Sequence, residues 1–144
     1  MLDLEEEVDR EELFARAAEE LAERTGKSPD KLARALQDRE EQSSTAVNRW
    51  LAVPHIVLSG QKTFELLMVR SREGIYFSEE APEVHAVFIL AGTMDERNFH
   101  LFSLSAIAQI AANEEFQERW NRAKNTRALK DVILLSNRMR QQAG

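Results

Sequence analysis

The chain has 144 residues, 43% of them hydrophobic, and a formal net charge of −6 at pH 7. This length and composition suit one domain with a substantial apolar core, so we expect a single domain over residues 1–144. The acidic balance argues against non-specific nucleic-acid binding. The absence of cysteine excludes disulfides and thiolate metal sites, and it is consistent with a reducing, cytoplasmic location. The sequence contains neither a signal-peptide pattern nor an apolar run of membrane-spanning length. It can still be the cytoplasmic domain of a larger transporter, in which case only the joined transporter would link it to a membrane.

Two helices are expected at the start of the chain. Asp9 opens a capping-box pattern, and apolar residues then recur at helical spacing up to Gly26, which can end the helix in a left-handed conformation. Ser28 and Pro29 are a typical cap and first position for a second helix, which presents Arg39 near its end. We therefore predict a helical hairpin that leads into the first strand.

Three apolar segments predict neighbouring strands: residues 47–53, 63–69 and 84–90. The last segment is almost unbroken in its apolar character, which suits a strand covered on both faces. Residues 71–74 predict a turn, and residues 75–77 predict a short further strand. We interpret His85, at the start of the third segment, as a structural residue.

The second half of the chain predicts further helices capped by Asp95, Asn113 and Thr126. Phe116 and Trp120 share one face of the middle helix. The last helix is expected to bury four apolar residues, Leu129, Val132, Ile133 and Leu135. Strands that alternate with helices indicate an α/β fold. We expect a three-layer sandwich in which a mostly parallel mixed sheet is flanked by helices on both faces.

The position of His55 in the sequence favours a chemical role. Pro54 follows the apolar run 47–53, and proline cannot donate to a strand ladder, so we expect the strand to end there. His55 would then lie at the rim of the core. Histidine titrates near neutral pH and offers a nucleophilic ring nitrogen. The same pattern is also typical of a half-buried histidine with one satisfied hydrogen bond.

Four groups of residues together resemble a known family: Arg39 with Ser44-Thr45, Ala52-Val53-Pro54-His55, Gly74-Ile75-Tyr76-Phe77, and His100-Leu101 opening a long helix. Their order and spacing are similar to those of the IIA domain of the mannitol/fructose type (type 2) of the bacterial phosphotransferase system. The resemblance extends from about residue 10 to about residue 136. It is closest to the nitrogen-regulatory copies and to the copies fused to transporters.

This resemblance implies a phosphocarrier site. In the family, the histidine matching His55 carries the phosphoryl group, and the residues matching His100 and Arg39 assist it. A guanidinium suits phosphate, and Ser44 and Thr45 can supply hydroxyl or backbone donors. Phosphoryl transfer to imidazole requires positioning and positive charge, so we expect no cofactor and no metal. Taken singly, each of these residues also has an ordinary structural explanation.

Five residues near the histidine depart from the family pattern, namely Ala46, Asn48, Arg49, Trp50 and Ile56. The family usually has glycines before the Pro-His pair and a small residue after it. We expect the charged and apolar side chains of Arg49, Trp50 and Ile56 to surround His55, with Phe99 adding to this face, and to make it suitable for docking a partner. These departures favour a copy that regulates over one that relays.

The sequence therefore predicts a domain that is phosphorylated on His55 by a phosphohistidine carrier protein and that regulates a transporter membrane domain or another partner. Two alternatives stay open. The domain can be a phosphocarrier, and so a phosphotransferase component, that relays phosphate to a sugar-specific IIB component. It can also be a binding module that kept the fold and lost the chemistry.

Overall fold

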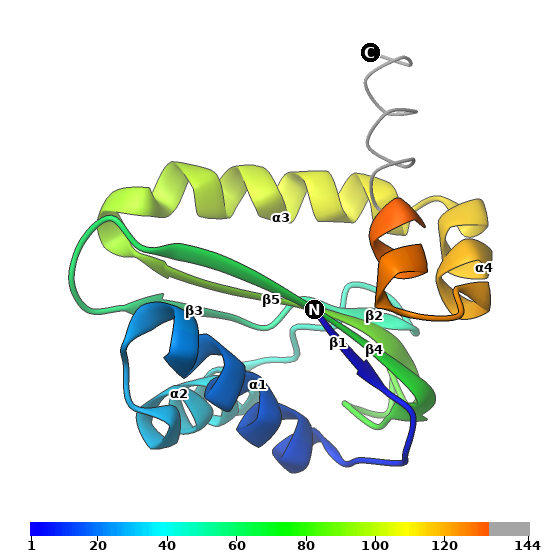
Figure 1. Ribbon diagram of the computed structural model, residues 1–144, viewed down its shortest axis with the longest axis horizontal. Helices are drawn as coiled ribbons and strands as arrows, with labels where there is room; N and C mark the ends of the chain where they lie inside the picture. The colour runs from blue at the N-terminus through cyan, green and yellow to red at the C-terminus, as the bar shows by residue number, and fades with distance from the viewer. Residues whose placement is uncertain (133–144) are drawn as a thin grey trace.

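The computed structural model describes residues 1–132. Its sheet consists of β1 (Leu2–Leu4), β2 (Leu51–Ala52), β3 (His55–Leu58), β4 (Phe64–Ile75) and β5 (Val84–Thr93). Helices α1 (Arg10–Thr25) and α2 (Pro29–Gln42) cover one face, and α3 (Arg97–Ala111) and α4 (Glu114–Arg122) cover the other (Figure 1). A short 3-10 helix, η1 (Met94–Glu96), leads into α3. The predicted three-layer α/β sandwich is confirmed.

Strand β5 is the centre of the sheet. The strand order is β1-β4-β5-β2, and β3 also pairs with β5. Strands β2 and β3 follow one another along β5, because Leu51 lies opposite Ala86 and His55 lies opposite Leu90. Three of the pairings between described strands are parallel, whereas the long β4–β5 ladder is antiparallel. The mixed, mostly parallel sheet agrees with the prediction, and the three predicted strand regions are neighbours.

The first predicted strand, 47–53, differs most from the structure. Only Leu51–Ala52 is strand, because the Asn48 side chain accepts hydrogen bonds from the main-chain N–H groups of Trp50 and Leu51 and bends the chain. Strand β2 ends before Pro54, as expected, but the chain does not leave the sheet there. The Pro54 carbonyl still accepts from Leu90 N–H at 2.9 Å, so pairing resumes at once in β3, which begins at His55.

Strand β4 is longer than the sequence predicted. The turn expected at residues 71–74 lies inside it, as an irregularity in register between Arg70 and Ile75. Ser71 Oγ accepts from Gly74 N–H at 3.0 Å, and Gly74 has a φ of +88°. The strand therefore bends at this point and continues to Ile75.

Strand β1 was not predicted, and a buried ion pair attaches it to β4. The Asp3 carboxylate accepts from Arg70 Nε at 2.9 Å and from Arg70 Nη2 at 2.7 Å. Arg70 is only 2% exposed, and it also donates to the main-chain carbonyls of Trp120, in α4, and of Ala123, directly after α4. One guanidinium thus joins the N-terminal strand, the sheet and the helical layer above it.

Apolar side chains form one core on each face of the sheet. Alternate residues of β5 contribute to different cores, with Val87, Ile89 and Ala91 facing α1 and α2, and Ala86, Phe88 and Leu90 facing α3 and α4. Phe116 and Trp120 are buried in the second core. This confirms that segment 84–90 is covered on both faces.

The predicted helix caps are mostly confirmed. Asp9, Ser28 and Asn113 cap α1, α2 and α4 through their side chains. Asp95 does not cap α3, because its carboxylate accepts from Lys62 N–H at 2.9 Å and so joins the loop after β3 to η1.

The cap of the last predicted helix lies one residue earlier than expected. Residues 126–132 are helical. The cap is Asn125, whose side chain accepts from Ala128 N–H at 2.9 Å, so the expected cap Thr126 is the first helical residue. Leu129 is buried and Val132 packs against the second core, whereas Ile133 and Leu135 lie outside the described residues. Within residues 1–132, none of the helices is both long and apolar enough to cross a lipid bilayer.

Candidate functional site

Three predicted site residues converge at the edge of the sheet. His55 is the first residue of β3, Arg39 lies in the last turn of α2, and His100 lies near the start of α3. The ring centroids of the two histidines are 5.4 Å apart, with the ring planes at 77°. Arg39 Nη2 lies 3.3 Å from His55 Nε2. Helices from both layers reach His55 because β3 pairs with β5 at the edge of the described sheet.

The hydrogen bonds of His55 define which ring nitrogen can react. His55 Nδ1 lies 2.9 Å from the main-chain carbonyl of Val53. A carbonyl oxygen only accepts hydrogen bonds, so we assign the proton of the neutral ring to Nδ1. Nε2 then carries the lone pair, and it lies toward the Arg39 guanidinium, which is a donor. The arrangement leaves Nε2 as the nucleophilic atom.

The two histidines line a cavity of about 290 Å³. Its other described lining residues are mostly apolar: Val57, Gly92, Thr93, Met94, Arg97, Leu101 and Leu104. Arg97 was missed by the sequence analysis. Its position three residues before His100 on a helix was the available signal, because such residues share a helix face.

The pKa of His100 lies below its ordinary value of 6.5, mainly because burial disfavours the charged imidazolium and secondarily because His55 is near. At neutral pH His100 is therefore an uncharged ring that can donate one hydrogen bond and accept another. This is the form required of a residue that donates to a phosphoryl oxygen without carrying charge of its own.

Thr45 and Ser44 have local hydrogen bonds of their own. The N–H and the hydroxyl of Thr45 donate to the two carboxylate oxygens of Glu40, at 2.9 and 2.6 Å. Glu40 and Thr45 are both buried. The Thr45 carbonyl accepts from Val53 N–H at 2.9 Å. Glu40 and Thr45 therefore fix the backbone segment that directly precedes His55. Ser44 Oγ accepts from Ala46 N–H at 3.2 Å. Neither Ser44 nor Thr45 is among the residues lining the cavity of His55 and His100, and their role in phosphate binding stays a prediction.

Comparison with known proteins gives a family. The family model "Phosphoenolpyruvate-dependent sugar phosphotransferase system, EIIA 2" matches residues 2–135. The chain belongs to this family. The chain is 31% identical over 113 residues to the PTS system fructose-specific EIIABC component of Bacillus subtilis, a match that covers 76% of this chain but only 18% of that protein. It is 28% identical over 126 residues to a nitrogen regulatory protein of Bradyrhizobium diazoefficiens, covering 87% of this chain and 80% of that protein.

Solved structures of the family have the same fold. The nitrogen regulatory protein IIA-Ntr from Neisseria meningitidis superposes with a TM-score of 0.83 at 24% identity, covering 91% of both chains. IIA mannitol from Escherichia coli gives a TM-score of 0.74 at 20% identity, covering 91% of this chain and 94% of the other. These likenesses show that the α/β sandwich of this EIIA domain is the family fold.

The residues expected to surround the histidine of this EIIA domain lie elsewhere. Ile56 is buried in the core beneath α1 and α2. Trp50 packs against Phe116 with 5.9 Å between ring centroids, and with Arg49 it lines a different cavity beside His85. The expectation was wrong because successive residues of a strand point to opposite faces, so Ile56 points into the core, and because Trp50 lies beside the start of β5.

Four exposed apolar side chains lie around the two histidines, and we call them the apolar rim: Val57, Met94, Phe99 and Leu101. Val57, Met94 and Leu101 line the His55 cavity, and their exposed fractions are 64%, 68% and 52%. Phe99 is 61% exposed and packs against Phe64, which also contacts the His100 ring. Apolar side chains gathered on an exposed face are typical of a docking surface.

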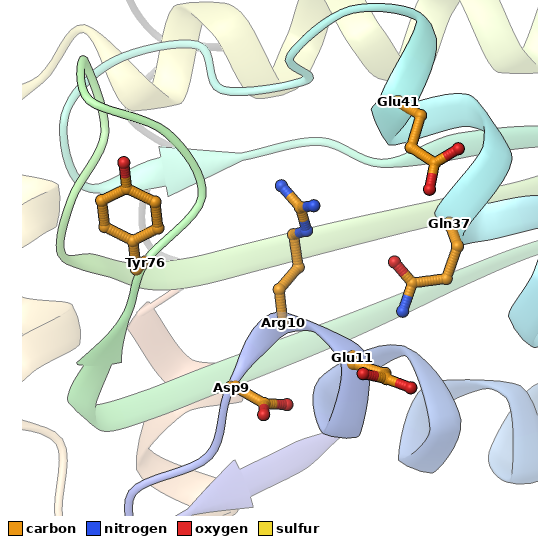
Figure 2. Close-up of a pocket in the computed structure, with 6 residues that line it drawn as sticks. All are labelled: Asp9, Arg10, Glu11, Gln37, Glu41 and Tyr76. Carbon is orange, nitrogen blue, oxygen red and sulfur yellow. The ribbon is translucent and has the colours of Figure 1, made fainter.

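A larger cavity, of about 590 Å³, lies between α1, α2 and the segment that follows β4 (Figure 2). Its lining residues are Asp9, Arg10, Glu11, Gln37, Glu41 and Tyr76. Arg10 Nη1 donates to the Phe77 carbonyl at 2.9 Å, which holds the guanidinium in place. None of the predicted site residues lines this cavity. Among residues 1–132 no cluster of three or more His, Asp or Glu side chains could hold a metal ion.

Proposed function

We propose that this EIIA domain accepts a phosphoryl group on Nε2 of His55 from a phosphohistidine carrier protein, and that the phosphorylated domain regulates a transporter to which it is joined or docked. The observation that carries this proposal is the pair of contacts at His55. Nδ1 is engaged by the Val53 carbonyl, and Nε2 lies 3.3 Å from the Arg39 guanidinium. Such a role belongs in the cytoplasm, at the inner face of the membrane when the partner is a transporter.

The transfer itself requires little from the protein beyond positioning. The Nε2 lone pair of His55 attacks phosphorus as the P–N bond of the donor phosphohistidine breaks, and the donor imidazole leaves with that electron pair. His55 keeps its proton on Nδ1, and this N–H donates a hydrogen bond to the Val53 carbonyl. Arg39 stabilises the negative oxygens of the phosphoryl group during transfer, and the uncharged His100 donates a hydrogen bond to one of them.

Regulation follows from where the charge appears. Phosphorylation adds about two negative charges at His55, beside the apolar rim. A partner that covers the rim in one state would have to bury those charges in the other, and an unpaired buried charge is strongly unfavourable. The phosphoryl group thus changes the affinity of a docked partner without refolding the domain.

A relay to a sugar-specific IIB component is the second candidate. The fold of this chain matches that of the Escherichia coli mannitol IIA in its complex with phosphorylated mannitol IIB, with a TM-score of 0.75 at 20% identity. The fructose-specific relative also favours this role by its name. The same His55 chemistry serves both roles, so the two differ in the step that follows phosphorylation. A third possibility, a binding module without phosphorylation, is excluded if His55 accepts phosphate.

The first experiment measures labelling. The protein is incubated with a phosphohistidine carrier protein bearing labelled phosphate, and incorporation is followed over time. Wild type should acquire an acid-labile label, because a phosphoramidate bond hydrolyses in acid. His55→Ala should acquire none, and Arg39→Ala should react about ten- to hundredfold more slowly because a charge-assisted contact is lost.

His85→Gln is the matched control for labelling. His85 is bonded to the Ser71 carbonyl and to Glu83, away from the cavity of His55, so this variant should label like wild type. Acid-stable label, or label that survives His55→Ala, would contradict the proposal.

The second experiment separates regulation from relay. Transport is measured in the parent protein or a reconstituted pair with wild-type His55, His55→Ala and His55→Glu. Regulation predicts that Ala and Glu give different transport rates. Equal transport in all three proteins, together with rapid onward transfer of phosphate to a sugar-specific IIB protein, would contradict regulation and support the relay.

A further inference from the structure

The cavity beside His55 contains one permanently charged side chain among its described lining residues, that of Arg97. The hydroxyl of Thr93, the other polar lining residue apart from the histidines, bonds to the backbone of Thr63, whose carbonyl and N–H each lie 3.2 Å away. His100 is uncharged at neutral pH because burial lowers its pKa. Arg97 is therefore the side chain that brings a permanent positive charge to the α3 side of this cavity.

The position of Arg97 on its helix aims it at the same cavity as His100. Arg97, His100, Leu101 and Leu104 all line it, and the spacing of three, four and seven residues from Arg97 places the four on one stripe of α3. Arg39 approaches His55 from α2, which belongs to the other helical layer. The two arginines therefore flank the histidine from opposite layers of the sandwich.

The Arg97 side chain is available for such a contact. It is exposed, and it makes no hydrogen bond or ion pair with any side chain or carbonyl of residues 1–132. The neighbouring Asp95 carboxylate already accepts from Lys62 N–H. A guanidinium beside a nucleophilic histidine, without a carboxylate partner in the described part of the chain, is suited to bind an anion that arrives there.

We propose that Arg97 is a second phosphoryl-binding residue, which contacts the oxygens of the phosphoryl group on His55 from the α3 side. This proposal rests on the proposed function of His55. Arg39 contacts Nε2 before transfer, whereas Arg97 contacts the phosphoryl oxygens both during transfer and in the phosphorylated product. Two guanidinium groups on opposite sides match the charge of a phosphoryl dianion.

The test compares wild type, Arg97→Ala, Arg97→Lys and the control Arg122→Ala, whose arginine is exposed on α4 and pairs with Glu118. Each protein is phosphorylated with a phosphohistidine carrier protein and, separately, with the small donor phosphoramidate. The ³¹P resonance of the phosphohistidine is then titrated against pH. The small donor has no docking surface, so it reports on phosphoryl contacts alone.

Arg97→Ala should slow phosphorylation by both donors by roughly tenfold. It should also raise the pKa of the phosphoryl group by roughly half a unit or more, since a nearby cation favours the dianion. Arg97→Lys should recover part of both effects because it keeps the charge, and Arg122→Ala should match wild type.

Three results would overturn the proposal. An unchanged ³¹P titration and unchanged rate with phosphoramidate would show that Arg97 does not contact the phosphoryl group. Slowing with the carrier protein alone would assign Arg97 to partner docking instead. Unlabelled wild type would overturn the function of His55 as well, which distinguishes that failure from a failure of Arg97 alone.

Discussion

Replacing Glu40 by alanine tests the contact that positions the chain before His55. The Glu40 side chain is buried and accepts from both the N–H and the hydroxyl of Thr45. Alanine leaves two buried donors without an acceptor, and each costs about 1–3 kcal/mol. The Thr45 hydroxyl can rotate toward another acceptor, so we expect a total loss of about 2–4 kcal/mol in the free energy of unfolding. For a domain of this size that loss lowers Tm by about 5–15 °C.

Two further variants make the prediction specific. Glu40→Gln keeps the shape, with its carbonyl oxygen accepting from Thr45 N–H and its amide donating to the hydroxyl, so it should cost about 1 kcal/mol. Thr45→Val removes one donor and should cost about the same. The double variant Glu40→Ala/Thr45→Val should cost less than the sum of its single variants by about 1 kcal/mol, since valine leaves no hydroxyl unsatisfied.

The assay is equilibrium urea denaturation, followed by the fluorescence of Trp50 and Trp120. The same proteins are tested for phosphate acceptance, because the Thr45 carbonyl holds Val53 and Val53 holds His55. Glu40→Ala should therefore label more slowly even where it is fully folded. Ordinary surface substitutions change the free energy of unfolding by no more than about 0.5 kcal/mol. A free energy of unfolding for Glu40→Ala within that range of wild type would refute this reasoning. A Glu40→Gln variant as unstable as Glu40→Ala would refute it as well.

Three further predictions follow from other contacts. Asp3→Asn should cost about 2–3 kcal/mol at pH 7, because it leaves the buried Arg70 guanidinium without its carboxylate but with its carbonyl acceptors. The pKa of the Asp3 carboxyl lies below its ordinary value of 3.8, chiefly through its hydrogen bond with Arg70. The stability that the ionised Asp3 carboxylate provides is thus present above pH 3.8 and is lost as the pH falls through the folded-state pKa. The free energies of unfolding of wild type and Asp3→Asn should therefore converge in acid. A difference between them that stays unchanged down to pH 2 would count against the ion pair. Gly74→Ala should lower the free energy of unfolding by about 1–2 kcal/mol, because φ is +88° and the new Cβ overlaps Glu83 Cγ. The control is Gly26→Ala, where φ is +73° and the space around the residue is open. It should lower the free energy of unfolding by less in the same denaturation assay. NMR titration should place the pKa of His100 below 6.5, and His55→Gln should raise it only part of the way because burial is the larger cause; full recovery in that variant would show that burial is not the main cause.

Local patterns predicted the parts of the fold that depend on neighbouring residues. The caps at Asp9, Ser28 and Asn113 require only a side chain and the N–H groups two or three residues later. The strand at 84–90 required only its apolar character. The order of Arg39, His55 and His100 along the chain predicted that their side chains meet, through the resemblance to a family and not through any local rule.

Other features depend on partners far away in the sequence. Strand β1 has three residues, and its pairing is held by Asp3 and Arg70, which are 67 positions apart. Glu40 looks like an ordinary charged residue of a surface helix until the fold brings Thr45 over it. The exposed rim at Val57 and Leu101 could not be separated from core residues by composition, because both are apolar residues in regular elements.

The most direct test of the central claim is a ¹⁵N NMR spectrum of the protein with labelled histidines, recorded before and after phosphorylation. Before phosphorylation, His55 should show a proton on Nδ1 and none on Nε2, as its contacts with Val53 and Arg39 require. After phosphorylation, coupling to ³¹P should appear at Nε2 of His55, with Nδ1 still protonated. Phosphorus bonded to Nδ1 of His55, or to His100, would contradict the account.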